Sequence, residues 1–157
     1  MAEIHGSCRC GQVKLRLRGA PVMTMACHCT GCQKMTASAF SLSTLYPAEA
    51  FAVTAGEPVI GALHGEHRHL FCPHCLSWMF TKPKGMDAFV LVRAMLLDDA
   101  AEYRPFIETC ADEKLPWATT QAIHSFDNYP PPERYPALMA EFAQARAQTR
   151  GPDRGQA

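Results

Sequence analysis

Seven of the eight cysteines in this 157-residue chain lie in short clusters, and this spacing constrains the fold more than any other feature. The clusters are Cys8-Arg-Cys10, Cys27-His-Cys29-Thr-Gly-Cys32 and Cys72-Pro-His-Cys75. Cysteines one or two residues apart can place their sulfurs on one metal ion, but they pair poorly as disulfides across a fold. Zinc has four protein ligands in structural sites and an open position in catalytic sites. Seven cysteines therefore predict one closed four-thiolate site and one open three-thiolate site.

Two of the clusters suit the closed site. Cys72-Pro-His-Cys75 has the spacing of a zinc knuckle, in which the backbone turns both thiolates toward one ion. Cys8-Arg-Cys10 can supply the second pair, because Gly6 and Gly11 beside it let the backbone bend. An ion shared by these pairs would tie the N-terminus to a distant hairpin, so that metal-binding energy becomes folding energy.

The remaining cluster, Cys27, Cys29 and Cys32, lacks a fourth ligand of its own. His28 lies inside it, but its neighbours already point at the metal, so we expect its side chain to face away. Cys110 is expected to be a small buried hydrophobe. Both stay open as alternative fourth ligands. A coordinating thiol is deprotonated, and a thiolate is a nucleophile, so an open three-thiolate zinc predicts sulfur chemistry rather than hydrolysis.

Composition narrows the possible partners and the location. The chain is 48% hydrophobic and has no apolar run near the roughly 20 residues of a membrane span, so we expect no membrane association. Its formal net charge is zero and no basic block stands out, so we expect no nucleic-acid partner. The N-terminus does not resemble a signal peptide. We therefore expect a cytoplasmic protein, in which close cysteines favour metal or catalysis over disulfides.

The pattern of short apolar segments predicts a mainly β fold. Residues Gln12 to Arg18 alternate apolar and polar side chains, as a half-buried strand does. The knuckle is expected on a tight turn between two strands. Further strands are predicted at residues 39–46, 51–53, 67–71, 78–81 and 89–92.

The C-terminal part has a different pattern. A short amphipathic helix is predicted from Pro136 to Thr149, followed by a frayed tail. We expect a single domain, with residues 1–132 as its zinc-binding β part and residues 133–157 as its C-terminal helix and tail.

One competing motif is rejected. His64-Gly-Glu66 followed by Cys72-Pro-His-Cys75 is similar to the zinc nucleoside deaminase signature. In that signature the proline precedes the cysteine pair, and a longer segment separates the two parts. His64, His67 and His69 are instead expected to be solvated residues on a strand and its turn, with His67 and His69 on one face.

The quoted residues resemble the glutathione-dependent formaldehyde-activating enzyme family, which includes centromere protein V. The matching elements are Gly6-Ser-Cys-Arg-Cys-Gly-Gln-Val13, Cys27-His-Cys-Thr-Gly-Cys32 with Ser38-Ala-Phe40, and Phe71-Cys-Pro-His-Cys75, with weaker matches at Pro116-Trp117 and Phe126. The resemblance spans about residues 4 to 130.

This resemblance implies a fold of several small antiparallel sheets, shared with methionine-R-sulfoxide reductases and a zinc-bearing chaperone of small GTPases. It also implies two Zn²⁺ per chain. Cys8, Cys10, Cys72 and Cys75 would hold a structural zinc, and Cys27, Cys29 and Cys32 a catalytic zinc. The family's founding activity adds formaldehyde to the thiol of glutathione, which is a carbon–sulfur lyase reaction. The chain departs from the family where glycine is usual, at Leu76 and Ala37.

Three functions are consistent with these features. The first is a zinc-dependent carbon–sulfur lyase acting on a glutathione-like thiol adduct of a small carbonyl compound, for which His28 or Ser38 is a candidate general acid. The second is a non-catalytic zinc module that binds a protein or small molecule. The third is redox cycling of the Cys27–Cys32 thiols, and we rank it last because Cys27 and Cys29 are awkwardly spaced for a disulfide.

Overall fold

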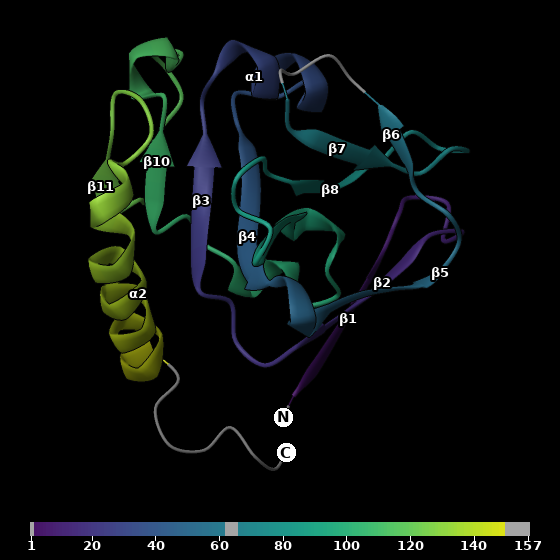
Figure 1. Ribbon diagram of the computed structural model, residues 1–157. Coiled ribbons are helices and arrows are strands. Elements are labelled where there is room, and N and C mark those ends of the chain that lie inside the picture. The colour runs from purple at the N-terminus through teal and green to yellow at the C-terminus, as the bar shows by residue number, and fades with distance from the viewer. Residues whose placement is uncertain (1, 62–65, 150–157) are drawn as a thin grey trace.

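The structure is a computed structural model, and it describes residues 2–61 and 66–149 of the chain (Figure 1). Short strands fill most of it, and one longer helix lies near the C-terminus. In chain order the strands and helices are β1 (Glu3–Ser7), β2 (Lys14–Arg18), β3 (Met23–Cys27), α1 (Thr30–Thr36), β4 (Ser41–Pro47), β5 (Phe51–Ala55), β6 (Val59–Gly61), β7 (Arg68–Phe71), β8 (Trp78–Lys82), β9 (Phe89–Arg93), β10 (Ile107–Thr109), β11 (His124–Ser125) and α2 (Tyr135–Thr149).

The strands form two sheets, which confirms a mainly β fold with a C-terminal helix. The smaller sheet has the order β1-β2-β5, and the larger has the order β11-β10-β3-β4-β9-β8-β7-β6. The larger sheet is not wholly antiparallel, because β10 runs parallel to both β3 and β11. The chain leaves β9 and crosses over before β10 begins, and such a crossover is what a parallel neighbour requires.

Six predicted strands are confirmed, at β2, β4, β5, β7, β8 and β9. The strands β1, β3, β6, β10 and β11 and the helix α1 were not predicted. In β3 both faces are largely buried, so its sequence Met-Thr-Met-Ala-Cys shows no alternation. The helix α1 has seven residues, too few for a helical pattern to emerge.

The main core lies between the two sheets. Leu15 and Leu17 of β2 are fully buried, whereas Lys14 and Arg18 at the ends of the strand are exposed, as the alternation predicts. They pack in one cluster with Tyr46 of β4 and with side chains of β8 and β9. Removing this apolar surface from water is the main stabilising contribution to the fold.

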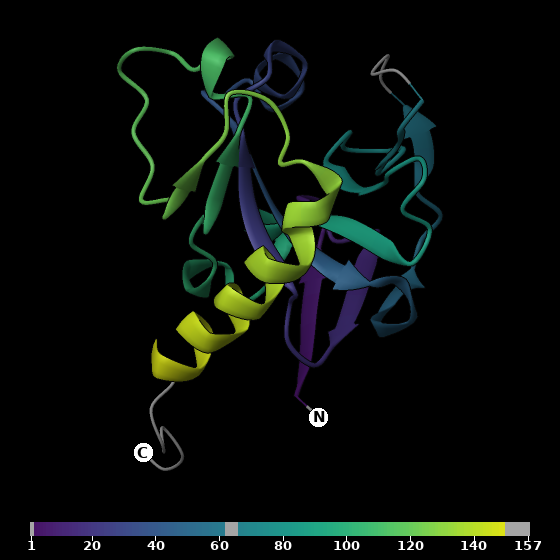
Figure 2. The same cartoon turned by 60° about the vertical axis from the view of Figure 1, so that its left-hand side comes forward.

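The helix α2 begins one residue before the predicted Pro136 and extends to Thr149, as predicted. Its Leu138 and Phe142 are buried in a second cluster with Met23 of β3 and Ile107 of β10. Figure 2 shows α2 lying against this part of the larger sheet. The predicted frayed tail lies outside the described residues. Within residues 2–61 and 66–149, no helix has both the length and the apolar character needed to cross a membrane.

Candidate metal centres and the adjoining pocket

Four cysteine sulfurs from two distant turns meet in what we call the four-cysteine cluster. One pair lies in the turn between β1 and β2, and the other in the turn between β7 and β8, as the knuckle predicts. All four sulfurs lie within 4.8 Å of one another. The Cys10 and Cys72 sulfurs are 3.8 Å apart, close to the roughly 3.8 Å expected in a tetrahedral site with Zn–S of about 2.3 Å. The cluster comprises Cys8, Cys10, Cys72 and Cys75.

Hydrogen bonds to sulfur favour the thiolate form of Cys8 and Cys75. At Cys10, by contrast, a backbone hydrogen bond from Gln12 is outweighed by burial and the neighbouring thiols, which raise the pKa of Cys10 to about 12. The Val13 backbone N–H donates to Cys8 Sγ at 3.2 Å, and the Ser77 hydroxyl lies 3.2 Å from Cys75 Sγ. Hydrogen bonds with Ser77 outweigh the opposing effect of burial and lower the pKa of Cys75 to about 5. Thiolates are the form that binds zinc, so this donor set suits such an ion.

The two flanking glycines have different roles. Gly11 has a φ of +76°, so it supplies the backbone turn that its position predicts. Gly6 instead allows a close approach between chain segments, because a Cβ there would lie 2.6 Å from the Leu96 carbonyl oxygen.

Three further cysteines form the three-cysteine cluster at the junction between β3 and α1. Cys27 ends β3, Cys29 is the N-cap of α1, and Cys32 lies in the first turn of that helix. Their sulfurs also lie within 4.8 Å of one another, and all three residues are buried. The Cys32 backbone N–H donates to Cys29 Sγ at 3.4 Å. Three converging thiols in this geometry could hold one metal ion.

His28 faces away from the three-cysteine cluster, as expected. Its ring is fully buried, and its Nε2 lies 3.1 Å from Glu108 Oε2 on β10. Glu108 also accepts hydrogen bonds from Lys114 Nζ at 2.9 Å and Thr120 Oγ1 at 2.7 Å. Burial raises the pKa of Glu108, but these hydrogen bonds together outweigh it and bring the pKa to about 2. A charged carboxylate thus anchors the segment between Cys27 and Cys29.

Cys110 is a buried neighbour of the three-cysteine cluster but not a member of it. It packs against these cysteines with 4% of its surface exposed, yet it lies outside the group whose sulfurs are within 4.8 Å of one another. Burial, and then the nearby Cys27, raise its pKa to about 12. Its burial agrees with the expectation of a small buried hydrophobe.

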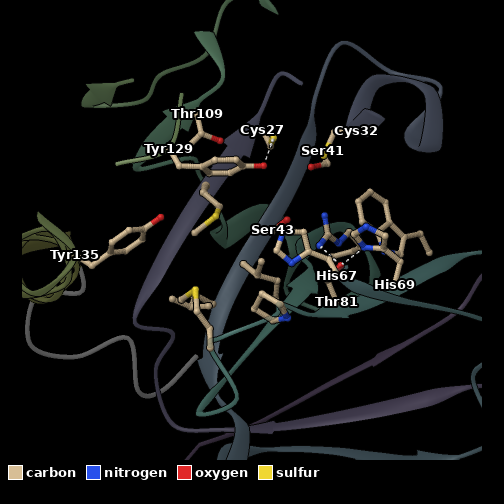
Figure 3. A pocket seen from close by; sticks show the side chains of 17 residues that line it. Cys27, Cys32, Ser41, Ser43, His67, His69, Thr81, Thr109, Tyr129 and Tyr135 are labelled. Atoms are coloured by element: carbon tan, nitrogen blue, oxygen red, sulfur yellow. Dashed lines mark hydrogen bonds between the residues drawn. The ribbon is translucent and has the colours of Figure 1, made fainter. Parts of the chain in front are cut away.

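A pocket of about 200 Å³ opens beside the three-cysteine cluster (Figure 3). Cys27 and Cys32 line it, whereas none of the four-cysteine cluster does. The Tyr129 hydroxyl points toward Cys27 and lies 4.0 Å from its sulfur. Tyr129 is 55% exposed, but partial burial of its side chain and then the nearby thiols raise its pKa, so the group stays protonated at neutral pH. The sequence offered no signal for Tyr129 beyond its place before three prolines.

The opposite wall of the pocket is polar. His69 Nδ1 and Thr81 Oγ1 are 2.8 Å apart, and Arg93 Nη2 donates to the same hydroxyl at 3.0 Å. The Arg93 guanidinium also stacks 3.7 Å above the Trp78 ring. The only sequence signal for Arg93 is a charge at the end of the apolar segment 89–92.

The histidine prediction is partly wrong. His69 is only 4% exposed, because its strand β7 lies inside the larger sheet and its ring packs edge-on against Trp78 at 5.0 Å. His67 is exposed, as predicted, and both rings line the pocket, which confirms their shared face. His64 lies outside the described residues.

The two residues that replace glycines usual in the family, Ala37 and Leu76, have a left-handed backbone. Ala37 has a φ of 50° and Leu76 a φ of 57°, so both adopt the left-handed conformation that glycine adopts most readily. Ala37 ends α1 after the three-cysteine cluster, and Leu76 follows the knuckle directly. Both loops therefore keep a glycine-like shape at a cost in strain.

The sequence profile of the glutathione-dependent formaldehyde-activating enzyme family matches residues 3–113, a span that contains both cysteine clusters. Among solved structures, the crystal structure of a Rhodobacter sphaeroides protein, a structural genomics target, is similar in fold. That protein is 16% identical, the alignment covers 60% of this chain and 87% of that chain, and the TM-score is 0.51. No curated protein matches the sequence. Because the family profile covers well over half of the residues, the chain belongs to the glutathione-dependent formaldehyde-activating enzyme family.

Proposed function

We propose that this chain is a zinc-dependent carbon–sulfur lyase that acts on a thiol adduct of a small carbonyl compound. Family membership supports a glutathione-like thiol as the partner. The observation that carries the proposal is the unequal placement of the two clusters, since Cys27 and Cys32 of the three-cysteine cluster line the pocket of about 200 Å³ and no residue of the four-cysteine cluster lines it. The cytoplasm is the proposed location, because free thiols and thiolate ligands need reducing conditions.

The two clusters would hold two Zn²⁺ per chain with different roles. The four-cysteine cluster offers a closed ligand set, and the three-cysteine cluster leaves one position for a substrate sulfur. A zinc bound there would keep an incoming thiol as its thiolate. We propose that residues 1–132 form the zinc-binding β part and that residues 133–157 are the helix and tail of the same domain. The packing of Leu138 from this helix against the sheet supports a single domain.

Forming the adduct requires the thiol to lose a proton, which goes to solvent, and the carbonyl oxygen to gain one from a donor that then recovers its proton from solvent. The sulfur attacks the carbonyl carbon, a C–S bond forms, and the electron pair of the C=O bond moves to oxygen, which takes a proton. In the reverse direction the C–S bond breaks and the hydroxyl proton leaves. Tyr129 is the proposed proton donor to that oxygen, because its hydroxyl lines the pocket 4.0 Å from Cys27 Sγ. His28 and Ser38 do not line the pocket, so Tyr129 replaces both candidates.

Apolar side chains form another part of the wall of the pocket beside the three-cysteine cluster. Met25, Leu45 and Leu91 line the same pocket and give it an apolar wall. The volume of about 200 Å³ suits a small carbonyl compound.

The test measures how fast a thiol and a small aldehyde exchange with their adduct, by NMR, with zinc-loaded protein. We expect wild type to accelerate the exchange above the uncatalysed rate and Cys29→Ser to abolish the acceleration. Cys110→Ala is the matched control, because it removes a buried thiol outside the three-cysteine cluster. No acceleration by wild-type protein with two zinc ions would contradict the lyase assignment and favour the non-catalytic zinc module. Tyr129→Phe should slow the exchange by about 100-fold while leaving thiol binding intact.

A further inference from the structure

Arg93 is a buried cation in the wall of the pocket. Only 7% of its surface is exposed, and it ends β9 facing the same cavity as Cys27 and Cys32. Among the described residues, no carboxylate lies within 4.0 Å of its guanidinium. Buried charges are normally paired, because an unpaired one keeps the full cost of leaving water.

The neighbours of Arg93 compensate its charge only in part. The Trp78 ring attracts the guanidinium from one side, and Thr81 Oγ1 accepts one hydrogen bond. Within residues 2–61 and 66–149, the buried Nε has no hydrogen-bond partner. Thr81 also bonds His69, so its hydroxyl is fixed and holds the guanidinium plane in place. The result is a guanidinium held in one plane in the wall of the cavity, and a fixed guanidinium suits the recognition of a carboxylate.

The size of the pocket limits which ligands can contact both Arg93 and the three-cysteine cluster. Its volume of about 200 Å³ is below the roughly 300–1,000 Å³ of pockets for drug-sized ligands. Cys27, Cys32 and Arg93 line this one cavity, so a single small ligand can face the three-cysteine cluster and the guanidinium together. A ligand that spans them needs only a few bonds between its sulfur and its anionic group.

We infer that Arg93 binds the carboxylate of a compact mercaptocarboxylate, or of its carbonyl adduct, whose sulfur lies at the three-cysteine cluster. The inference rests on the proposed function and narrows its substrate class. In glutathione the amino-acid unit that carries the sulfur has amide bonds on both sides, so no carboxylate lies close to the sulfur. Compact thiol acids are therefore expected to bind more tightly than glutathione.

The experiment compares two thiols of nearly equal size, 3-mercaptopropionate and 3-mercaptopropionamide, by calorimetric titration into protein with two zinc ions. We expect wild type to bind the acid at least about 10-fold more tightly than the amide. Arg93→Gln should remove this preference by weakening the acid alone. Arg93→Lys should restore part of it, because the charge returns without the planar fork. Arg104→Gln, an exposed arginine outside the pocket, is the control and should keep the preference.

The outcomes separate this inference from the proposed function. Equal affinity of wild type for the acid and the amide would overturn the inference and leave the lyase assignment standing. A two-zinc protein that binds neither thiol would overturn both. If Arg93 only balances the negative charge of the three thiolates, Arg93→Gln will weaken both thiols and zinc binding alike, which also overturns the inference. Should Arg93→Gln fail to fold, the comparison of the two thiols on wild type still decides.

Discussion

The two cysteine clusters use the same ligand chemistry in different surroundings. The four-cysteine cluster joins the β1–β2 turn to the β7–β8 turn, which are more than sixty residues apart in the chain, and it lines no part of the substrate-sized pocket. The three-cysteine cluster comes from one continuous segment between β3 and α1, and it opens onto the pocket. A complete ligand set that links distant segments favours a structural role, whereas an incomplete set beside a cavity favours chemistry.

The clusters also differ in what positions them. Cys8 and Cys75 receive hydrogen bonds from a nearby backbone N–H and a serine hydroxyl, and the Arg9 N–H donates to the Ser77 hydroxyl between the two turns that carry them. The segment of the three-cysteine cluster is held by the hydrogen bonds of Glu108 to His28, Lys114 and Thr120. The first cluster should therefore need its metal to keep the fold, and the second should keep its shape without metal.

The largest expected effect on stability comes from opening the four-cysteine cluster. Cys72→Ser should lower the free energy of unfolding by at least about 3 kcal/mol, because it breaks the link between two distant turns. For a chain of this size, the melting temperature should fall by about 10 °C or more. Circular dichroism melting of the zinc-loaded protein measures this. A melting temperature within 2 °C of wild type would show that this cluster holds no structural metal.

A smaller effect is expected when the anchor of the three-cysteine cluster is removed. Glu108→Gln should cost about 2–3 kcal/mol, because hydrogen bonds to a buried charge are lost. The folded-state pKa of Glu108 is about 2, below its ordinary 4.5. This contribution is therefore fully present above pH 4.5 and is lost as the pH falls toward 2. Urea unfolding of both proteins across this range should show their stability difference shrinking in acid, and a constant difference would exclude the anchor role.

The smallest effect concerns the two strained loops. Ala37→Gly and Leu76→Gly should each stabilise the protein by about 0.5–1 kcal/mol. Glycine relieves the left-handed strain, and this gain outweighs the greater backbone entropy that glycine loses on folding. Leu76 is 70% exposed, so little packing is lost. Ala140→Gly in the exposed face of α2 is the control and should destabilise by up to about 1 kcal/mol. If the loop variants destabilise as the control does, the loops are not strained.

The sequence predicted the parts of this molecule that depend on local pattern. Spacing alone indicated the division into four and three cysteines, and alternation located β2 with its buried Leu15 and Leu17. The strand β3 was missed because a strand buried on both faces has no alternation.

The pocket was not predictable in the same way, because its walls come from distant segments. Arg93 and Tyr129 reach the three-cysteine cluster only through the pairing of β9 with β4 and the path of the chain after β11. The prediction of a solvated His69 is wrong because its burial depends on Trp78 and on the position of β7 inside the larger sheet. Tertiary contacts of this kind leave no mark on the local sequence pattern.

The central claim is that the three-cysteine cluster leaves its metal open to a thiol. Calorimetric titration of glutathione and of 3-mercaptopropionate, with zinc content measured in each sample, tests it most directly. We predict two zinc ions and one thiol-binding site per chain in wild type. Cys29→Ser should contain one zinc ion, bind no thiol and melt within a few degrees of wild type. A wild-type protein that holds two zinc ions yet binds no thiol at millimolar concentration would contradict the account.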